Sequence, residues 1–211
     1  MKELFKKINS IYHSHNIDFY CSLLGPLTMF IIHLISVMMH FEWLTFNYAL
    51  FFLLMIFIKT FLFFDEKYDW KINTYLVAAI STVFLSIPMM VSFILTILYR
   101  DAPSYIFEWL IYAYALYATI KIVVAIRKRI KAKYGETERT YVSSWIGLVG
   151  ALYTLQMLEF RLIKFVEGDN VSDQMYMMQL FTQGLIFLFA VFVVILFVYR
   201  FMNNKKTADL Q

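Results

Sequence analysis

The chain has 211 residues, of which 61% are hydrophobic, 19% are aromatic and only 16% are charged, with a net charge of +4. Soluble domains average about 45–50% apolar and about 25% charged residues, so this composition excludes an ordinary water-soluble domain. The single cysteine, Cys21, excludes an internal disulfide framework and a multi-cysteine metal site. Basic residues flank the apolar segments, a pattern typical of membrane proteins and not of nucleic-acid binding.

The first element expected is an amphipathic helix over residues 1–15. Leu4 and Ile8 recur at helical spacing, and Lys6 lies on the opposite side. Such a helix suits the headgroup plane of a bilayer. A frayed tail is the alternative, because short helices are marginal unless they dock. The first apolar run is too long for a cleavable signal peptide, so we expect it to be retained. The expected domains are the interfacial helix 1–15, a transmembrane domain 16–202 and a cytoplasmic tail 203–211.

Six apolar runs follow, and each is close to the ~20 residues that cross a bilayer as a helix. They are Phe19–His40, Leu44–Phe64, Thr74–Tyr99, Tyr105–Ile126, Tyr141–Ile163 and Tyr176–Tyr199. Barrel strands alternate in polarity over about ten residues, and these runs do not. The sequence therefore predicts an all-α membrane protein with six transmembrane helices. A tight turn is expected between the first two runs.

The basic residues predict the orientation of the helices. With the N-terminus inside, fourteen lysines and arginines lie in inner segments, and three, Arg100, Arg161 and Lys164, lie in outer ones. By the positive-inside rule, both termini are then cytoplasmic. The fourth helix is expected to continue past the membrane to a cap at Gly135, with Glu138 in the first turn of the next helix.

A basic stretch at the end of the fourth helix is a candidate anionic-lipid patch. Clustered basic residues attract acidic headgroups, although a topology anchor is the simpler interpretation. The patch comprises Arg127, Lys128, Arg129, Lys131 and Lys133.

A short motif occurs twice. Phe41–Leu50 reads FEWLTFNYAL and Phe107–Leu116 reads FEWLIYAYAL, and each opens an even-numbered helix at its outer end. With a weaker likeness between Tyr20-x-Ser22 and Tyr141-x-Ser143, this indicates three pseudo-repeated helical hairpins. Parallel repeats of this kind build some transporters around a central site. Chance similarity between apolar helices is the alternative.

Ionisable and polar residues within the runs are candidate functional groups, because such residues are costly at bilayer depth. If the carboxylates converge in the folded protein, they form an acidic vestibule that attracts cations or moves protons. The alternative is that each carboxylate is separately solvated at the membrane interface. The candidate polar pathway comprises Glu42, Glu108, Tyr153, Gln156 and Glu159.

Other polar and small residues favour structural roles. His33 and His40 lack the spacing of metal ligands, so we expect no metal site and interpret His33 as a polar packing residue. Gly147 and Gly150 give the fifth helix a small-residue face that favours close packing. Pro88 is expected to kink the third helix.

Motifs of known enzymes do not appear in the sequence. It has no His-Glu-x-x-His, Gly-x-Ser-x-Gly, Walker loop or dinucleotide fingerprint. No nucleophile or acid–base pair comes with a positioned partner. We therefore expect no enzymatic activity and no cofactor.

The segment Glu108–Tyr117, followed by Lys121 and a basic loop, resembles a group of uncharacterised six-helix membrane proteins from Gram-positive bacteria. The likeness extends from about Tyr12 to Glu159 and implies a bacterial plasma membrane. It brings no catalytic or binding residues.

Two functions remain open at this point. One is a small transporter or ion-coupled permease, and the other is a non-catalytic membrane subunit, immunity factor or lipid- or protein-interacting protein. The expected partners are the lipid bilayer, with anionic headgroups on the cytoplasmic side, and a membrane-protein partner or a second copy of the chain. Nucleic acid is not an expected partner.

Overall fold

A computed structural model describes residues 15–68, 73–98, 108–133, 138–168 and 171–208, and this part of the chain is helical apart from short connections. The expected helix over residues 1–15 lies almost wholly outside these ranges, as does Gly135. The described helices are α2 His15–Met39, α3 Trp43–Tyr68, α4 Thr74–Leu98, α5 Glu108–Lys133, α6 Glu138–Glu167 and α7 Asp173–Ala208. Each contains one of the six predicted apolar runs or nearly all of it.

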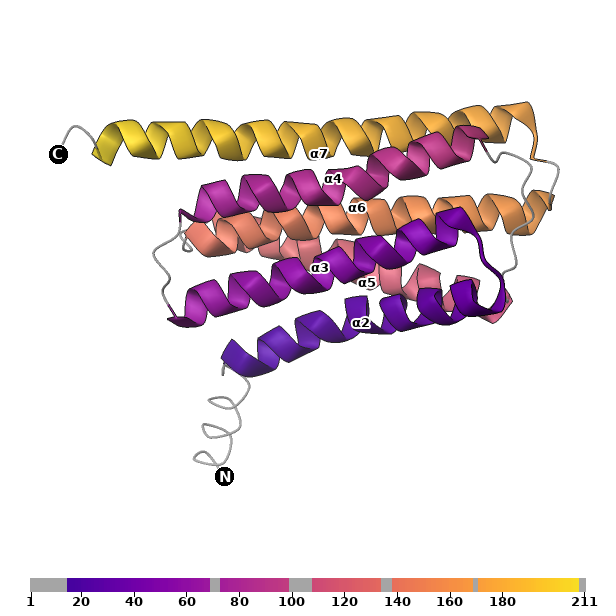
Figure 1. The fold of residues 1–211 in the computed structure, drawn as a ribbon, viewed down its shortest axis with the longest axis horizontal. Coiled ribbons are helices and arrows are strands. Elements are labelled where there is room, and N and C mark those ends of the chain that lie inside the picture. The colour runs from indigo at the N-terminus through magenta and orange to yellow at the C-terminus, as the bar shows by residue number, and fades with distance from the viewer. Residues whose placement is uncertain (1–14, 69–72, 99–107, 134–137, 169–170, 209–211) are drawn as a thin grey trace, which may run out of the picture.

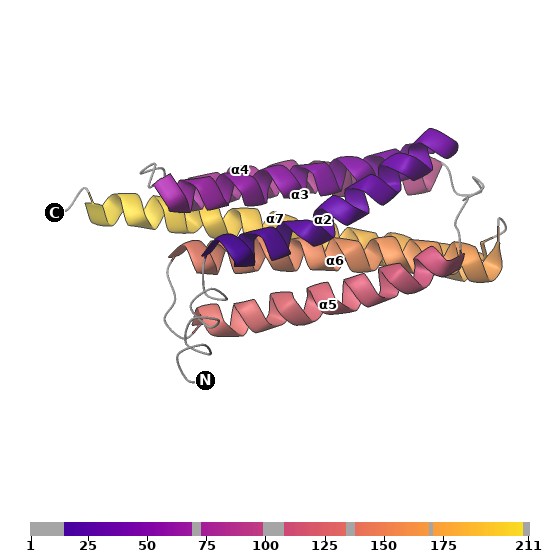
Figure 2. The same cartoon turned by 90° about the horizontal axis from the view of Figure 1, so that it is seen from below.

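The six helices lie side by side and alternate in direction, so that α2 begins and α7 ends at the same end of the bundle (Figure 1). Arg127, Arg129 and Arg200 lie toward this end, which we call the basic end. Helix α6 is the central element, because it packs against α3, α4, α5 and α7. Figure 2 shows α5 on one side of α6 and the α3–α4 pair on the other.

Five of the described helices are long and apolar enough to cross a membrane. These spans are Ser22–Met39, Trp43–Phe64, Thr74–Leu98, Tyr141–Glu167 and Asp173–Asn203. Helix α5 is not among the five, although it has the length of its neighbours and lies along α6 within the bundle. The prediction of an all-α fold with apolar spans is thus confirmed for five helices, and a crossing by α5 stays a prediction.

Local features of the helices follow the chemistry of the sequence. Only His40, Phe41 and Glu42 separate α2 from α3, so the predicted tight turn is confirmed. Helix α5 continues beyond Ile126 to Lys133, and Glu138 occupies the first turn of α6, where a negative charge opposes the helix dipole. Helix α4 continues as an α-helix through Pro88.

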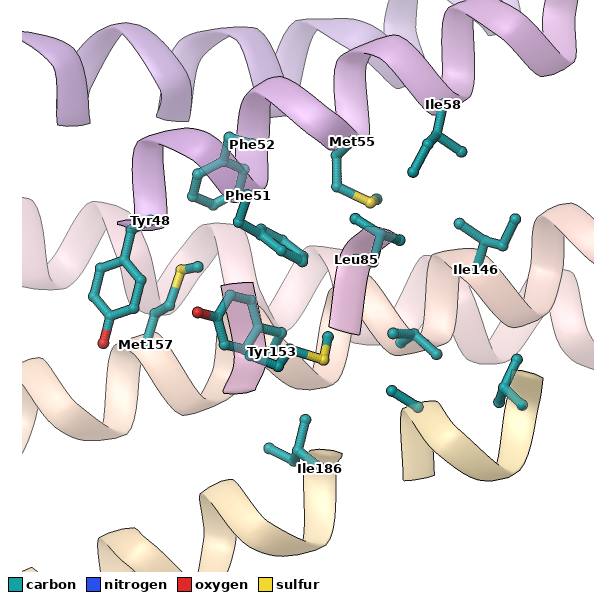
Figure 3. Packing of buried hydrophobic residues seen from close by; sticks show 14 of the residues in the cluster. Tyr48, Phe51, Phe52, Met55, Ile58, Leu85, Ile146, Tyr153, Met157 and Ile186 are labelled. Atoms are coloured by element: carbon teal, nitrogen blue, oxygen red, sulfur yellow. The ribbon is translucent and has the colours of Figure 1, made fainter. Parts of the chain in front are cut away.

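Aromatic and aliphatic side chains fill the space around α6. Tyr48, Phe51 and Met55 of α3 project toward Tyr153 and Met157 of α6 (Figure 3). The rings of Phe51 and Tyr153 are 4.3 Å apart between centroids, and both side chains are buried. This contact packs α3 tightly against α6.

The small-residue face of α6 packs closely at only one of its two glycines. A Cβ atom at Gly150 would lie 2.8 Å from Cε of Met55, whereas a Cβ at Gly147 would meet nothing within 4 Å. The expectation of close packing therefore holds at Gly150 and is wrong at Gly147. A closer approach occurs at Gly25 of α2, where a Cβ would lie 2.7 Å from the ring of Tyr117 on α5.

Candidate functional site

Many buried polar side chains gather in the half of the bundle away from the basic end. Their placement is unusual for a membrane helix bundle, because polar groups at such depth need partners or a function. The buried residues in this half are His33, Thr45, Asn47, Ser92, Thr96, Gln156, Arg161, Lys164, Gln179 and Gln183, with the tyrosines Tyr48, Tyr114 and Tyr153.

One group of these residues forms a hydrogen-bonded network, which we call the hydroxyl–amide cluster: Asn47, Ser92, Tyr153 and the carbonyl of Pro88. The side-chain amide of Asn47 donates to the Pro88 carbonyl at 2.8 Å and to Ser92 Oγ at 3.0 Å. The Tyr153 hydroxyl lies 2.5 Å from Ser92 Oγ and 3.1 Å from the same carbonyl. The network joins α3, α4 and α6 through direct hydrogen bonds between protein groups.

A second group, which we call the arginine cluster, comprises His33, Tyr48, Tyr114 and Arg161. Nδ1 of His33 donates to the Met29 carbonyl at 2.7 Å, because a carbonyl can only accept. Nε2 of His33 is bonded to the Tyr114 hydroxyl. His33 is 1% exposed, so its ring ties α2 to α5 inside the bundle. The expectation that His33 serves polar packing agrees with these bonds.

Arg161 is the charged member of the arginine cluster. Its side chain is 5% exposed, and its guanidinium carbon lies 5.1 Å from the ring centre of Tyr114 and 6.0 Å from that of Tyr48. Nε of Arg161 is buried and has no hydrogen-bond partner. Within the described ranges, no carboxylate forms an ion pair with this guanidinium. Glu42 interacts electrostatically with Arg161. The Glu42 carboxylate also accepts a hydrogen bond from the Thr45 hydroxyl at 2.5 Å.

The aromatic contacts of Arg161 offset only part of the cost of burying its positive charge. A cation over an aromatic face gains up to about 2 kcal/mol when it is desolvated. Burying an ion costs several kcal/mol even after the protein relaxes. Helical side chains also lean toward the N-terminus of their helix, which for α6 is the basic end, so Arg161 leans into the bundle and away from the near surface. The aromatic contacts alone therefore do not offset the cost of burying the Arg161 charge.

The two tyrosines that flank Arg161 occupy the same position of the repeated motif. Tyr48 is the eighth residue of Phe41–Leu50, and Tyr114 is the eighth residue of Phe107–Leu116. Both are 1% exposed, and both place a ring near the same guanidinium. The motif thus supplies two equivalent walls of one site, whereas common ancestry of the hairpins stays a prediction.

The described members of the predicted polar pathway have different surroundings, and the pathway itself stays a prediction. Tyr153 and Gln156 are fully buried, and the Gln156 Nε2 has no hydrogen-bond partner. Glu159 is half-buried; it accepts a bond from Thr182 of α7 at 3.2 Å and lines a cavity of about 320 Å³ with mostly apolar walls. Glu42 is half-buried near Arg161. Glu108 begins α5, and its side chain lies outside the described part of the structure.

The predicted anionic-lipid patch is described at two of its five members. Arg127 is exposed, whereas Arg129 is half-buried over the rings of Trp145 and Tyr141, at 4.4 Å and 4.8 Å from their centres. The side chains of Lys128, Lys131 and Lys133 lie outside the described set. The patch therefore contains at least two different settings for an arginine.

Sequence reasoning overlooked Arg161 because it counted this residue among the outer charges. In the structure, Arg161 and Lys164 are buried side chains of α6. The repeated motif held the clue that was available, because it marks Tyr48 and Tyr114 as equivalent. Nothing in the sequence indicates that they meet at an arginine more than forty residues away.

Comparison with protein-family models, with curated proteins and with solved structures finds no match for this chain. The class of protein therefore follows from the fold alone. The described part of the chain is helical and contains five apolar helices of spanning length, which is the character of a multi-pass membrane protein. Within the described ranges, no group of three His, Cys, Asp or Glu side chains is placed to hold a metal ion.

Proposed function

We propose that the protein is a small multi-pass membrane transporter that binds a negatively charged solute at Arg161. The observation that carries this proposal is a guanidinium that is buried among four helices, forms no ion pair with any carboxylate among the described side chains, and has no hydrogen-bond partner at Nε. Charged side chains at membrane depth commonly mark substrate or ion pathways. A carboxylate or phosphate group on the solute supplies the hydrogen-bond acceptor that Nε of Arg161 lacks.

The aromatic walls of the site suit such a solute. Tyr48 and Tyr114 exclude water from Arg161, and a low local dielectric strengthens the attraction between the guanidinium and an anion. The adjoining hydroxyl–amide cluster places further polar groups beside the site, on the side of α4. An anionic solute replaces the cation or proton substrate that the carboxylates Glu42, Glu108 and Glu159 first indicated.

We place the protein in a bacterial plasma membrane with the basic end, and hence both termini, in the cytoplasm. The support is the distribution of arginines and lysines together with the alternating course of the six helices. Reporter fusions at the two termini test this orientation. Fusions that report opposite sides of the membrane would overturn it.

Anion binding to the purified full chain tests the proposed function. We expect phosphate or a simple carboxylate such as acetate to raise the unfolding temperature in detergent, because a ligand that binds only the folded state stabilises it. Arg161→Met should abolish the shift. Lys121→Met removes a positive charge from α5 at a half-buried site outside the cluster and should leave the shift unchanged. An Arg161→Met variant that binds as well as the wild type would overturn the proposal.

A flux assay separates transport from binding. Proteoliposomes that contain the wild-type chain should exchange the bound anion, and those with Arg161→Met should not. Binding without flux would favour the second candidate function.

The second candidate is a non-catalytic membrane subunit. In that case Arg161 receives an acidic side chain from a partner protein, and the apolar outer faces of α2 and α7 contact that partner. Only 17% of the α2 span and 22% of the α7 span are buried within the chain, against 67% of the α6 span. Co-purification of a partner that is lost on Arg161→Met would support this role.

A further inference from the structure

A second arrangement of arginines and aromatic rings lies at the basic end, far from Arg161. We call it the basic-end cluster, and it comprises Tyr75, Arg129, Tyr141, Trp145 and Arg200. The guanidinium of Arg200 on α7 lies 4.0 Å from the ring centre of Tyr141 and donates to the Tyr75 hydroxyl at 3.3 Å. Arg129 on α5 lies 4.8 Å from the same ring. Two positive charges from separate helices thus meet at one tyrosine of α6.

Two hydrogen-bond donors in this cluster lack acceptors. Nη1 of Arg129 and Nε1 of Trp145 are buried without a partner, and the guanidinium stacks 4.4 Å from the ring centre of the same Trp145. A buried donor that lacks an acceptor is costly, so native structures usually provide one. Protein, water and ligand atoms can all act as the acceptor. At this site the two neighbouring guanidinium groups favour an acceptor that is negatively charged.

The depth of the cluster identifies the kind of anion. Tyr75 and Tyr141 lie within the first turn of α4 and α6, at the limits of apolar spans, and Tyr and Trp favour this headgroup level. Exposed apolar side chains border the two arginines: Ile126 and Ile130 on α5, Tyr199 and Met202 on α7. A ligand here contacts guanidinium groups and a lipid-facing apolar surface at once.

We infer that the basic-end cluster binds the phosphate of an anionic membrane lipid, with Arg129 and Arg200 as its cationic ligands and Trp145 Nε1 as a further donor. The acyl chains then lie along the exposed apolar side chains of α5 and α7. Glu138, which is exposed and interacts electrostatically with Arg200, disfavours a second anion on that side. This site is independent of the proposed transport function, because it shares no residue with the arginine cluster.

Lipid binding to the full chain in detergent tests the inference by native mass spectrometry. Phosphatidylglycerol should bind more tightly than phosphatidylcholine of the same acyl chains. Arg129→Gln should weaken the phosphatidylglycerol affinity about tenfold or more, as expected for lost hydrogen bonds to a charged group. Arg127→Gln is the matched control, because it removes the same charge two residues away from an exposed position. We expect a much smaller loss for this control.

Two further variants distinguish a built site from simple charge attraction. Arg129→Lys keeps the charge but loses the planar fork that stacks on Trp145, so the affinity should still fall. Trp145→Phe keeps the ring and removes only the Nε1 donor, and should weaken binding severalfold. Equal losses for Arg127→Gln and Arg129→Gln, or full affinity of Arg129→Lys, would overturn the inference.

A last arm separates the lipid from free phosphate. Inorganic phosphate or glycerol phosphate, added in excess, should not displace phosphatidylglycerol if the apolar border contributes to affinity. Displacement at equal concentration would show that the site recognises a soluble anion, and would overturn the assignment to a membrane lipid.

Discussion

The arginine cluster and the basic-end cluster use the same contact, a guanidinium over tyrosine, in two different surroundings. Arg161 is 5% exposed and is enclosed by His33, Tyr48 and Tyr114, whereas Arg129 and Arg200 are half-buried at the helix ends. The guanidinium carbon lies 5.1 Å from the nearer tyrosine ring centre at Arg161 and 4.0 Å from the nearer one at Arg200. The cost of removing the cation from water differs greatly, because it depends on burial.

This difference separates a role in function from a role in anchoring. A half-buried arginine at the headgroup level keeps part of its hydration, so its aromatic contacts are a net gain. A fully buried arginine that forms no ion pair with a carboxylate among the described side chains is a net loss to the folded state. Proteins retain such groups mainly where function requires them. Substitutions in the two clusters should therefore differ in the sign and size of their effects on stability.

The largest change in stability is expected on substitution of Arg161, and the test depends on whether stability rises or falls. Arg161→Met should raise the free energy of unfolding by about 1–4 kcal/mol, because apolar replacement of buried ionic groups is often stabilising. Chemical or thermal unfolding in detergent measures this change. A loss of stability would mean that the guanidinium holds the bundle together, and the contrast between the clusters would disappear.

A smaller loss is expected when α2 is pushed away from α5. Gly25→Ala places a methyl group 2.7 Å from the Tyr117 ring, and overpacking of this kind costs about 1–3 kcal/mol. It should also disturb the His33–Tyr114 bond while leaving the basic-end cluster intact. Gly147→Ala is the control, since its Cβ meets nothing, and it should be neutral or stabilising. Equal effects of the two substitutions would contradict the close approach of α2 to α5 at Gly25.

Removal of one hydroxyl from each cluster compares them directly. Tyr114→Phe leaves Nε2 of His33 without its partner inside the bundle, and should cost about 0.6–1.7 kcal/mol, the range for hydrogen bonds between membrane helices. Tyr141→Phe keeps the ring that both basic-end arginines contact, so its effect should be smaller. The difference in unfolding free energy between the two variants is the measurement; a larger loss for Tyr141→Phe would reverse the comparison.

The smallest effect is expected at Arg129. Arg129→Met removes two aromatic contacts of a half-buried cation and should lower stability by about 0.5–1 kcal/mol. Its sign is therefore opposite to that of Arg161→Met. Unfolding midpoints measured side by side for these two variants provide the test, and a shared sign would show that burial does not distinguish the two arginines.

The sequence by itself determined the helical class and the approximate positions of the described helices. Long apolar runs with basic ends predict spanning helices, since hydrocarbon tolerates only backbones whose hydrogen bonds are closed within the segment. The sequence also predicted the turn at His40–Glu42 and the acidic first turn of α6 at Glu138. Both features depend only on residues that are neighbours along the chain.

Only the tertiary structure decided which polar residues meet. A membrane helix is apolar on nearly every side, so periodicity does not reveal which face is turned inward. The spacing of Tyr153, Gln156 and Glu159 therefore predicted a single polar face of α6. In the structure, Tyr153 is hydrogen-bonded to Asn47 of α3, whereas Glu159 is hydrogen-bonded to Thr182 of α7. Arg161 meets Tyr48 and Tyr114 because the rotation and register of α3, α5 and α6 bring them together, and packing among all six helices sets these quantities.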